Sequence, residues 1–250
     1  MCVCGPRCLH ALFYTFTHTT KHGYNLGELN LWCKMTVFES GTRVPLMIRV
    51  PSPGDAAPAP PARVSSSLAE AVGLFPTLVE VAAKSTPPAF ADGTSLAPVL
   101  RDPAASVAKG AFSEFVKCYS CCRVADDAPC LPGGTQGRCA PTSPADAADL
   151  HEMGNCFQVP SNQIDFIGYS VRTTRWRYTE WLRFNGTLLH GDFGQRVANE
   201  LYDHAGDTGS AHDWDAFENE NVAADPTNAD TVAELRALLM EGFRPPMMVD

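Results

Sequence analysis

Alternation of apolar and polar side chains is clearest between Phe166 and Phe184. Tyr169, Val171 and Thr173 alternate there with polar residues, and the same period recurs in the second half of the stretch. A period of two is what a half-buried β-strand shows, because successive side chains point to opposite faces. The pattern therefore predicts a β-hairpin over residues 166–184.

Two shorter apolar runs predict further strands. Ala111–Phe115 is one of them. The other is Val44–Val50, which reads as a buried strand bounded by Pro45 and Pro51. Pro45 is tolerable near the start of a strand, where a missing N–H group costs little.

A capping box at Ser67 and Glu70 predicts the start of a helix, because each side chain can accept a hydrogen bond from an exposed backbone N–H group. Pro76 lies within this helix and predicts a kink or a restart. The residues expected to face the core are Leu74, Leu78 and Val81.

A second capping box, at Thr231 and Glu234, predicts a C-terminal helix that ends near Gly242. A short helix is also expected at Ser95–Leu100, before Asp102. The residues expected on the apolar face of the C-terminal helix are Val232, Leu235 and Leu239.

Composition limits the class of protein. The chain has 250 residues, of which 45% are apolar, and a formal net charge of -9. This composition is that of a globular protein with a core, and the acidic balance argues against a general nucleic-acid binder. No apolar run approaches the roughly 20 residues that span a bilayer, so no transmembrane segment is expected. The first residues, Met1–Thr20, fit a signal peptide poorly.

The ten cysteines favour an oxidising compartment. Six of them lie between Cys118 and Cys156. Zinc is the alternative, since Cys118 and Cys121 have ligand spacing, but no second pair completes a site. Asn185, in Asn-Gly-Thr, is a glycosylation acceptor that is consistent with secretion.

The richest chemistry lies between His22 and Val50. His22 and Lys34 flank a loop rich in Gly and Asn, and the predicted strand Val44–Val50 follows. An imidazole that can hold a metal and an ammonium group, delivered by an α/β sheet, suit the binding of a tetrahedral oxyanion.

This segment resembles the sulfatases of the alkaline-phosphatase-like superfamily, and within them the iduronate-2-sulfatase branch. The similar elements are His-Gly, Leu-Gly-Glu, Trp-x-Lys, Phe-Glu and Val-Pro-Leu in order. Weaker matches follow in Gly73–Leu78, in Gly168–Thr173 with Arg177–Thr179, in Glu200–Asp203 and in Glu218-Asn219. The resemblance implies an α/β fold: the closing part of a mixed sheet with flanking helices, then a small antiparallel-sheet subdomain with a helix.

The resemblance also implies roles for individual residues. His22 matches a ligand of a divalent ion, usually calcium, and Lys34 matches the lysine that contacts the sulfate. Without the family, each would read as an ordinary loop residue. Tyr24 could stack on a sugar ring or simply pack. Arg172 and Arg177 could reach a substrate carboxylate, although a solvated strand face is the alternative.

Several positions depart from the family pattern. Lys21 stands where the family has an Asp before the histidine, and an ammonium group there repels calcium. Leu29 replaces a frequent histidine. No Cys-x-Pro-x-Arg or Ser-x-Pro-x-Arg motif occurs, so the formylglycine nucleophile of the family has no source. We therefore expect a fragment, with a join near Thr20 and Lys21.

The expected organisation has four parts: residues 1–20 are atypical, 21–110 close the catalytic domain, 111–165 form a cysteine-rich insert, and 166–250 form the C-terminal subdomain. The expected function is hydrolysis of a sulfate ester on a sulfated saccharide, in the secretory pathway, lysosome or extracellular space. A non-catalytic secreted sugar-binding remnant and a phosphodiesterase of the same superfamily are the alternatives. The sequence leaves the oligomeric state open.

Overall fold

The computed structural model describes residues 23–50, 61–118, 156, 159–208 and 216–243. The chain divides into two compact units. One contains residues 1–21 and 44–111, and the other contains residues 22–43 and 112–250. The segment after His22 therefore groups with the C-terminal residues. The four-part division expected from the sequence stays a prediction.

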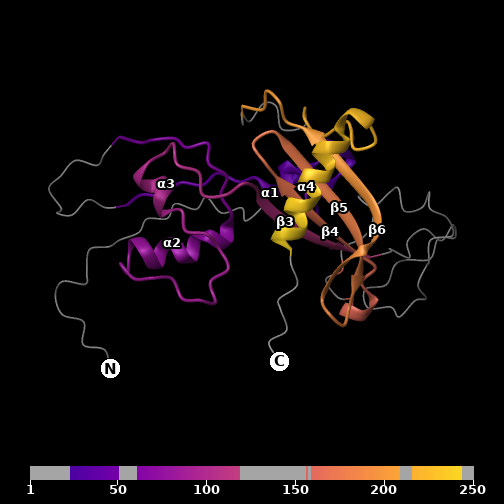
Figure 1. Cartoon of the computed structure of the whole chain (residues 1–250), viewed down its shortest axis with the longest axis horizontal. Coiled ribbons are helices and arrows are strands. Elements are labelled where there is room, and N and C mark those ends of the chain that lie inside the picture. Colours follow the sequence, from indigo (N-terminus) through magenta and orange to yellow (C-terminus); the bar gives the residue numbers. More distant parts are fainter. Residues whose placement is uncertain (1–22, 51–60, 119–155, 157–158, 209–215, 244–250) are drawn as a thin grey trace. The chain divides into compact units, whose positions relative to one another are not determined.

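A four-stranded sheet forms the centre of the second unit, in the order β3-β4-β5-β6 (Figure 1). Strands β4 and β5 are antiparallel with Ser170 opposite Thr179, and β5 and β6 are also antiparallel. The predicted hairpin and the predicted strand at 111–115 are thus confirmed. The bounds are Ala111–Lys117 for β3, Phe166–Arg172 for β4, Trp176–Asn185 for β5 and His190–Asp203 for β6.

Helix α4, Ala229–Gly242, covers one face of this sheet. Leu235 and Leu239 are buried against apolar residues of β4, β5 and β6, which confirms the predicted apolar face. The helix begins two residues before Thr231, directly after the 3-10 turn Pro226–Asn228. The predicted capping box at Thr231 is therefore wrong, because that residue already lies inside the first turn.

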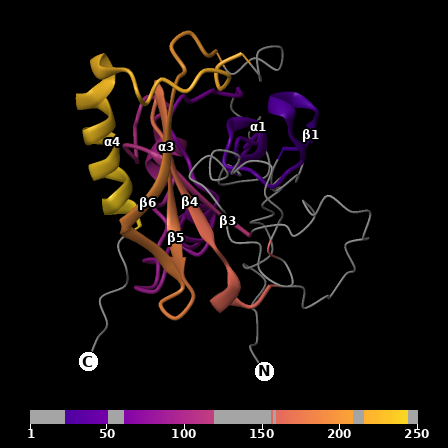
Figure 2. The same cartoon turned by 90° about the vertical axis from the view of Figure 1, so that its right-hand side faces the viewer.

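The opposite face of the sheet is covered by residues 23–43 (Figure 2). This segment contains β1 (Asn25–Leu26), a 3-10 turn (Glu28–Asn30), β2 (Trp32–Cys33) and α1 (Glu39–Thr42). Val37 packs on Phe166 and Trp181. Phe38 meets the ring of Tyr202 edge to face, with 5.6 Å between ring centroids. The segment that carries Lys34 thus has a buried base on the sheet.

In the described residues 44–50 and 61–110 of the first unit, the regular secondary structure consists of short helices. A 3-10 turn, Ala71–Gly73, leads into α2, Leu74–Val81, and α3 spans Ala97–Arg101. The Thr77 hydroxyl accepts a hydrogen bond from the N–H of Leu96 at 2.8 Å, which ties the start of α3 to α2. The short helix predicted at 95–100 is confirmed within two residues.

Two predictions for α2 are wrong. Ser67 does not begin a helix, and its hydroxyl instead donates to the neighbouring Leu68 carbonyl. Pro76 therefore falls in the first helical turn, where its missing N–H is harmless, and it is buried together with Thr77. Leu78, expected in the core, is 39% exposed.

The predicted strand Val44–Val50 is also wrong. These residues have no regular secondary structure, and Met47 is 55% exposed. An apolar run adopts a strand only with a neighbouring strand, and among the described residues none pairs with this one.

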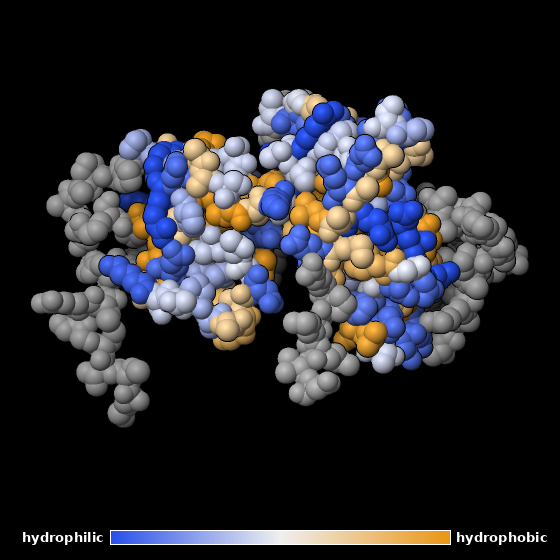
Figure 3. Space-filling view, in the orientation of Figure 1, coloured by the Kyte–Doolittle hydropathy of each residue, from blue (hydrophilic) through white to orange (hydrophobic). Residues whose placement is uncertain are grey.

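On the face drawn in Figure 3, hydrophobic residues lie in small groups among hydrophilic ones.

A disulfide joins Cys118, directly after β3, to Cys156. This bond supports disulfides over zinc for Cys118, and the other cysteines between these two lie outside the described residues. Among the helices that the structure describes, none has the length and apolarity needed to cross a membrane.

Candidate functional site

A short hairpin presents the lysine predicted to act at the site. Asn25 of β1 lies opposite Cys33 of β2, so Tyr24 and Lys34 flank the same end of the hairpin. The turn requires Gly27, whose φ of 123° is unfavourable for other residues. Tyr24 is 58% exposed, and Lys34 is half-buried. His22, the predicted metal ligand, lies outside the described residues.

The backbone after Lys34 is held at every second residue by side chains of the other elements. The ammonium group of Lys117 donates to the carbonyl oxygen of Met35 at 3.0 Å. The Arg177 guanidinium donates to the carbonyl oxygen of Val37 at 2.8 Å. The chain reaches Glu39 two residues later, where the backbone N–H donates to Glu218 at 2.7 Å.

Glu39 is the centre of an ion-pair network. Its carboxylate pairs with the guanidinium groups of Arg177 and Arg172, the latter at 3.2 Å, and with Arg43 at 3.1 Å. Burial by itself would raise the pKa of Glu39, but the charges of Arg177 and Arg172 outweigh it and lower the pKa. Glu39 is therefore ionised at neutral pH although its side chain is only 9% exposed.

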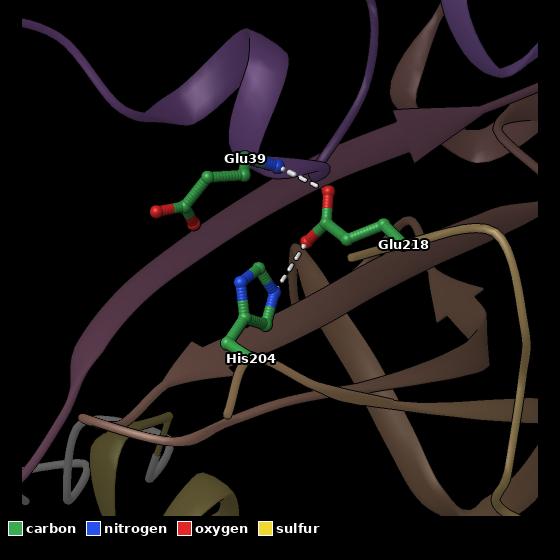
Figure 4. A group of neighbouring side chains, drawn as sticks. All are labelled: Glu39, His204 and Glu218. Carbon is green, nitrogen blue, oxygen red and sulfur yellow. Dashed lines mark hydrogen bonds and ion pairs between the residues drawn. The ribbon is translucent and has the colours of Figure 1, made fainter. Parts of the chain in front are cut away.

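His204 connects two further carboxylates of the network. Its Nδ1 lies 3.0 Å from Asp207. Its Nε2 lies 3.3 Å from Glu218 (Figure 4). The ring stacks on Phe217 with 5.7 Å between centroids. Glu218 also lies 2.5 Å from Nε of Arg177, so its carboxylate is shared between a histidine and an arginine.

The ligand atoms of Glu39, His204 and Glu218 lie within 4.8 Å of one another, close enough to hold a metal ion (Figure 4). The guanidinium of Arg177, however, contacts both carboxylates. Calcium requires six to eight oxygen ligands, and a guanidinium in their midst repels it. These residues do not fit calcium, and we interpret the cluster as a charge-balanced structural network of three carboxylates and three guanidinium groups (Glu39, Asp207, Glu218, Arg43, Arg172, Arg177).

The alternative of a solvated strand face for the two hairpin arginines is wrong. The side chain of Arg177 is 2% exposed and that of Arg172 is 12% exposed. Both guanidinium groups are engaged by carboxylates of the chain itself. Their contact with a substrate carboxylate stays a prediction, and the described contacts give it no support.

Sequence reasoning did not assign a role to Glu39, His204, Asp207 or Glu218. Glu39 and Glu218 did carry a signal, because both lie in short motifs that resemble sulfatases. The partners are too distant in sequence for spacing to reveal them, since Glu39 and Glu218 are separated by 179 residues.

Asn185 lies at the end of β5 in an exposed turn. Its side-chain oxygen accepts hydrogen bonds from the N–H groups of Thr187 and Leu188, each at 3.0 Å. The exposed position is compatible with glycosylation, which stays a prediction.

Comparison with known proteins gives one consistent likeness. No protein-family model matches the chain. Its sequence is 30% identical to human iduronate 2-sulfatase over 203 residues, or 74% of the chain. It is 28% identical to mouse iduronate 2-sulfatase over 92% of the chain. The chain spans only 35% and 41% of the lengths of these relatives.

Solved structures agree with the fold. A protein of Bacteroides thetaiotaomicron VPI-5482 assigned to the sulfatases matches 88% of the chain with a TM-score of 0.53 and 22% identity, over 34% of its own length. A protein solved in complex with its substrate D-glucosamine-2-N,6-O-disulfate matches the same share with a TM-score of 0.51 and 21% identity, over 32% of its length. The sequence relatives confirm the resemblance to a C-terminal portion of the sulfatases, and the solved structures confirm the predicted α/β fold class.

Proposed function

We propose that this chain is part of a sulfuric ester hydrolase that acts on a sulfated sugar, with the 2-O-sulfate of a uronic acid as the substrate group. The observation that carries the proposal is the 30% identity to human iduronate 2-sulfatase over 203 residues. The arrangement of the Lys34 hairpin on a buried base supports it, because an oxyanion site needs a cation held in place.

Lys34 binds a sulfate oxygen in this proposal. An ammonium group favours an anion, and its half-buried position weakens solvent screening of that attraction. The exposed ring of Tyr24, at the same end of the hairpin, offers a surface on which a sugar ring can stack. In a complete enzyme, His22 would be among the ligands of a calcium ion.

A non-catalytic sugar-binding protein is the second candidate. The sequence contains Lys21 where the resemblance implies an Asp, and it contains no Cys-x-Pro-x-Arg or Ser-x-Pro-x-Arg motif. A protein with these features can retain a site for a sulfated sugar without a nucleophile.

Binding and hydrolysis of a 2-O-sulfated uronic acid disaccharide separate these functions. Calorimetry measures binding, and ion chromatography measures released sulfate. We expect the chain to bind the disaccharide and Lys34→Met to weaken binding about tenfold, the loss of one charge-assisted hydrogen bond. The exposed Lys109→Met is the matched control. Released sulfate contradicts the sugar-binding function, whereas binding without release is compatible with both functions because the sequence contains no formylglycine motif. No binding by the wild-type chain contradicts both.

The 5′ end of the native transcript tests the proposed larger enzyme. A reading frame that continues upstream into an Asp-His-Gly junction and a Cys-x-Pro-x-Arg motif supports it. A transcript that starts at Met1 and encodes Lys21 contradicts it.

We also propose that the chain passes through the secretory pathway towards the lysosome or the cell exterior. The disulfide between Cys118 and Cys156 supports an oxidising compartment. Expression in mammalian cells followed by treatment with an N-glycosidase tests it. A mass shift that disappears in Asn185→Gln is expected, and an unglycosylated, fully reduced protein contradicts the proposal.

A further inference from the structure

We propose that Lys117 is a positioning residue, which fixes the backbone beside Lys34 and so holds that ammonium group in place for an anionic ligand. The part that concerns the ligand rests on the proposed function. The part that concerns the backbone rests on the contacts alone.

Lys117 is an unusual residue in its setting. It is the last residue of β3 and is 1% exposed, although lysine is almost never fully buried without a partner. Its ammonium group lies 3.0 Å from the Met35 carbonyl oxygen and 5.3 Å from the centroid of the Phe115 ring. A buried ammonium is costly, so its contact with the residue after Lys34 calls for a physical role.

The contact belongs to a series. Arg177 holds the carbonyl of Val37, and Glu218 holds the N–H of Glu39. Three successive alternate residues are thus fixed by buried charged groups from other elements. Lys117 is the member of this series nearest to Lys34, and it holds the backbone one residue away.

The electrostatic setting supports a charged Lys117 at neutral pH. Burial lowers the pKa of Lys117 to about 8, and the charge of Glu200 opposes that shift. Glu200 also accepts a hydrogen bond from the indole of Trp181 at 3.0 Å. A binding group acts well only when neighbouring contacts hold it within a fraction of an ångström. In this proposal, the series of contacts holds Lys34 in this way.

Hydrogen exchange followed by mass spectrometry tests the backbone part. Lys117→Met keeps the bulk of the side chain and removes the donor. The double variant Lys117→Met/Glu200→Gln also restores the charge balance, and Glu200→Gln alone is its reference. We expect residues 33–38 to exchange about tenfold faster in both variants that lack Lys117, with residues 229–242 unchanged. Unchanged exchange at 33–38 overturns the inference.

Binding of the 2-O-sulfated disaccharide tests the ligand part. Val232→Ala, on the opposite face of the sheet, serves as a variant of reduced stability with an intact Lys117, and Lys109→Met as the surface control. We expect Lys117→Met to weaken binding about fivefold and both controls to bind as the wild type does. Equal loss in Val232→Ala, or full binding by Lys117→Met, overturns the role in positioning Lys34.

The two assays keep the proposals apart. Faster exchange at 33–38 together with no binding by the wild-type chain refutes the proposed function and leaves the backbone role of Lys117 standing.

Discussion

At the scale of single residues, Glu39 illustrates why a buried charge is tolerated here. Its carboxylate faces three guanidinium groups, and its own N–H is bonded to Glu218. Removal of one member leaves the others buried without their counter-charge, which costs more than the intact pair contributes. The network therefore makes the position of residues 36–43 sensitive to any change in it.

We predict that Glu39→Gln lowers the free energy of unfolding by about 3–5 kcal/mol, because it leaves Arg177 and Arg172 without their shared carboxylate. Urea unfolding at neutral pH measures this loss. Glu80→Gln removes an acid from a solvent-exposed pair with Arg101 and should leave the midpoint unchanged. Equal midpoints for Glu39→Gln and the wild type would contradict the network.

The same variant has a predicted pH dependence. The pKa of Glu39 is lowered on folding from its usual 4.5, so its contribution is present above that value and is lost as the pH falls through the lower folded pKa. The gap in stability between wild type and Glu39→Gln should therefore narrow below about pH 4.5. A gap that stays constant in acid would show that the carboxylate charge is not its source.

The contribution of Lys117 to stability should also rise with pH, but in the alkaline range. Its pKa is about 8 in the folded chain, below the usual 10.5, so the unfolded state binds more protons between these values. Stability then rises with pH in this window, by at most about 1.4 kcal/mol per pH unit. Urea unfolding between pH 8 and pH 10 should show wild type gaining stability relative to Lys117→Met. A constant difference across the window would be inconsistent with a buried ammonium group.

At the scale of elements, the sequence predicted the strands and helices that a local pattern of residues specifies. Apolar and polar residues alternate over much of the hairpin at 166–184, so its two strands and their pairing could be predicted. Strand β6 was not predicted, because glycines at 191 and 194 and register shifts near Leu182 interrupt the period of two. Both capping-box predictions were wrong, because the same residue types also occur in loops and inside the first turn of a helix.

The candidate site likewise has a part that the local sequence indicates and a part that it does not. Lys34 lies in a short local motif and was identified from the sequence, but its hairpin was not, because only a loop rich in Gly and Asn was predicted there. The network around Glu39 joins residues from α1, β4, β5 and the segments after β6, and only the tertiary fold brings them together.

Helix α4 supports the sheet from the face opposite the Lys34 segment. Leu239 is fully buried in its core, and we predict that Leu239→Ala lowers the free energy of unfolding by about 2–5 kcal/mol through lost burial and a cavity. Thermal or urea unfolding measures it, with the exposed Glu234→Ala expected to change stability by no more than about 0.5 kcal/mol. A loss in Leu239→Ala as small as that of the control would contradict the packing of α4 on the sheet.

At the scale of the whole molecule, net charge restricts how a sulfated ligand can be bound. The chain carries -9 at neutral pH, with a pI near 5.2. The guanidinium groups of Arg172 and Arg177 are neutralised by carboxylates and offer little attraction at a distance. The net charge therefore opposes long-range attraction of a polyanion, and within the part of the chain that the structure describes we expect affinity to come from short-range contacts such as that proposed for Lys34.

Salt dependence distinguishes these two kinds of binding. A protein with a basic surface loses affinity for a polyanion steeply as the salt concentration rises. In this chain, salt screens both the attraction between Lys34 and the sulfate and the repulsion from the net negative charge, so the two effects partly cancel. We predict that the dissociation constant for a sulfated disaccharide changes less than about threefold between roughly 50 and 200 mM NaCl. Calorimetry at both salt concentrations measures it, with Lys34→Met as the reference for the local contact. A fall in affinity of a hundredfold would show that a basic surface outside the described residues, rather than the Lys34 hairpin, dominates binding.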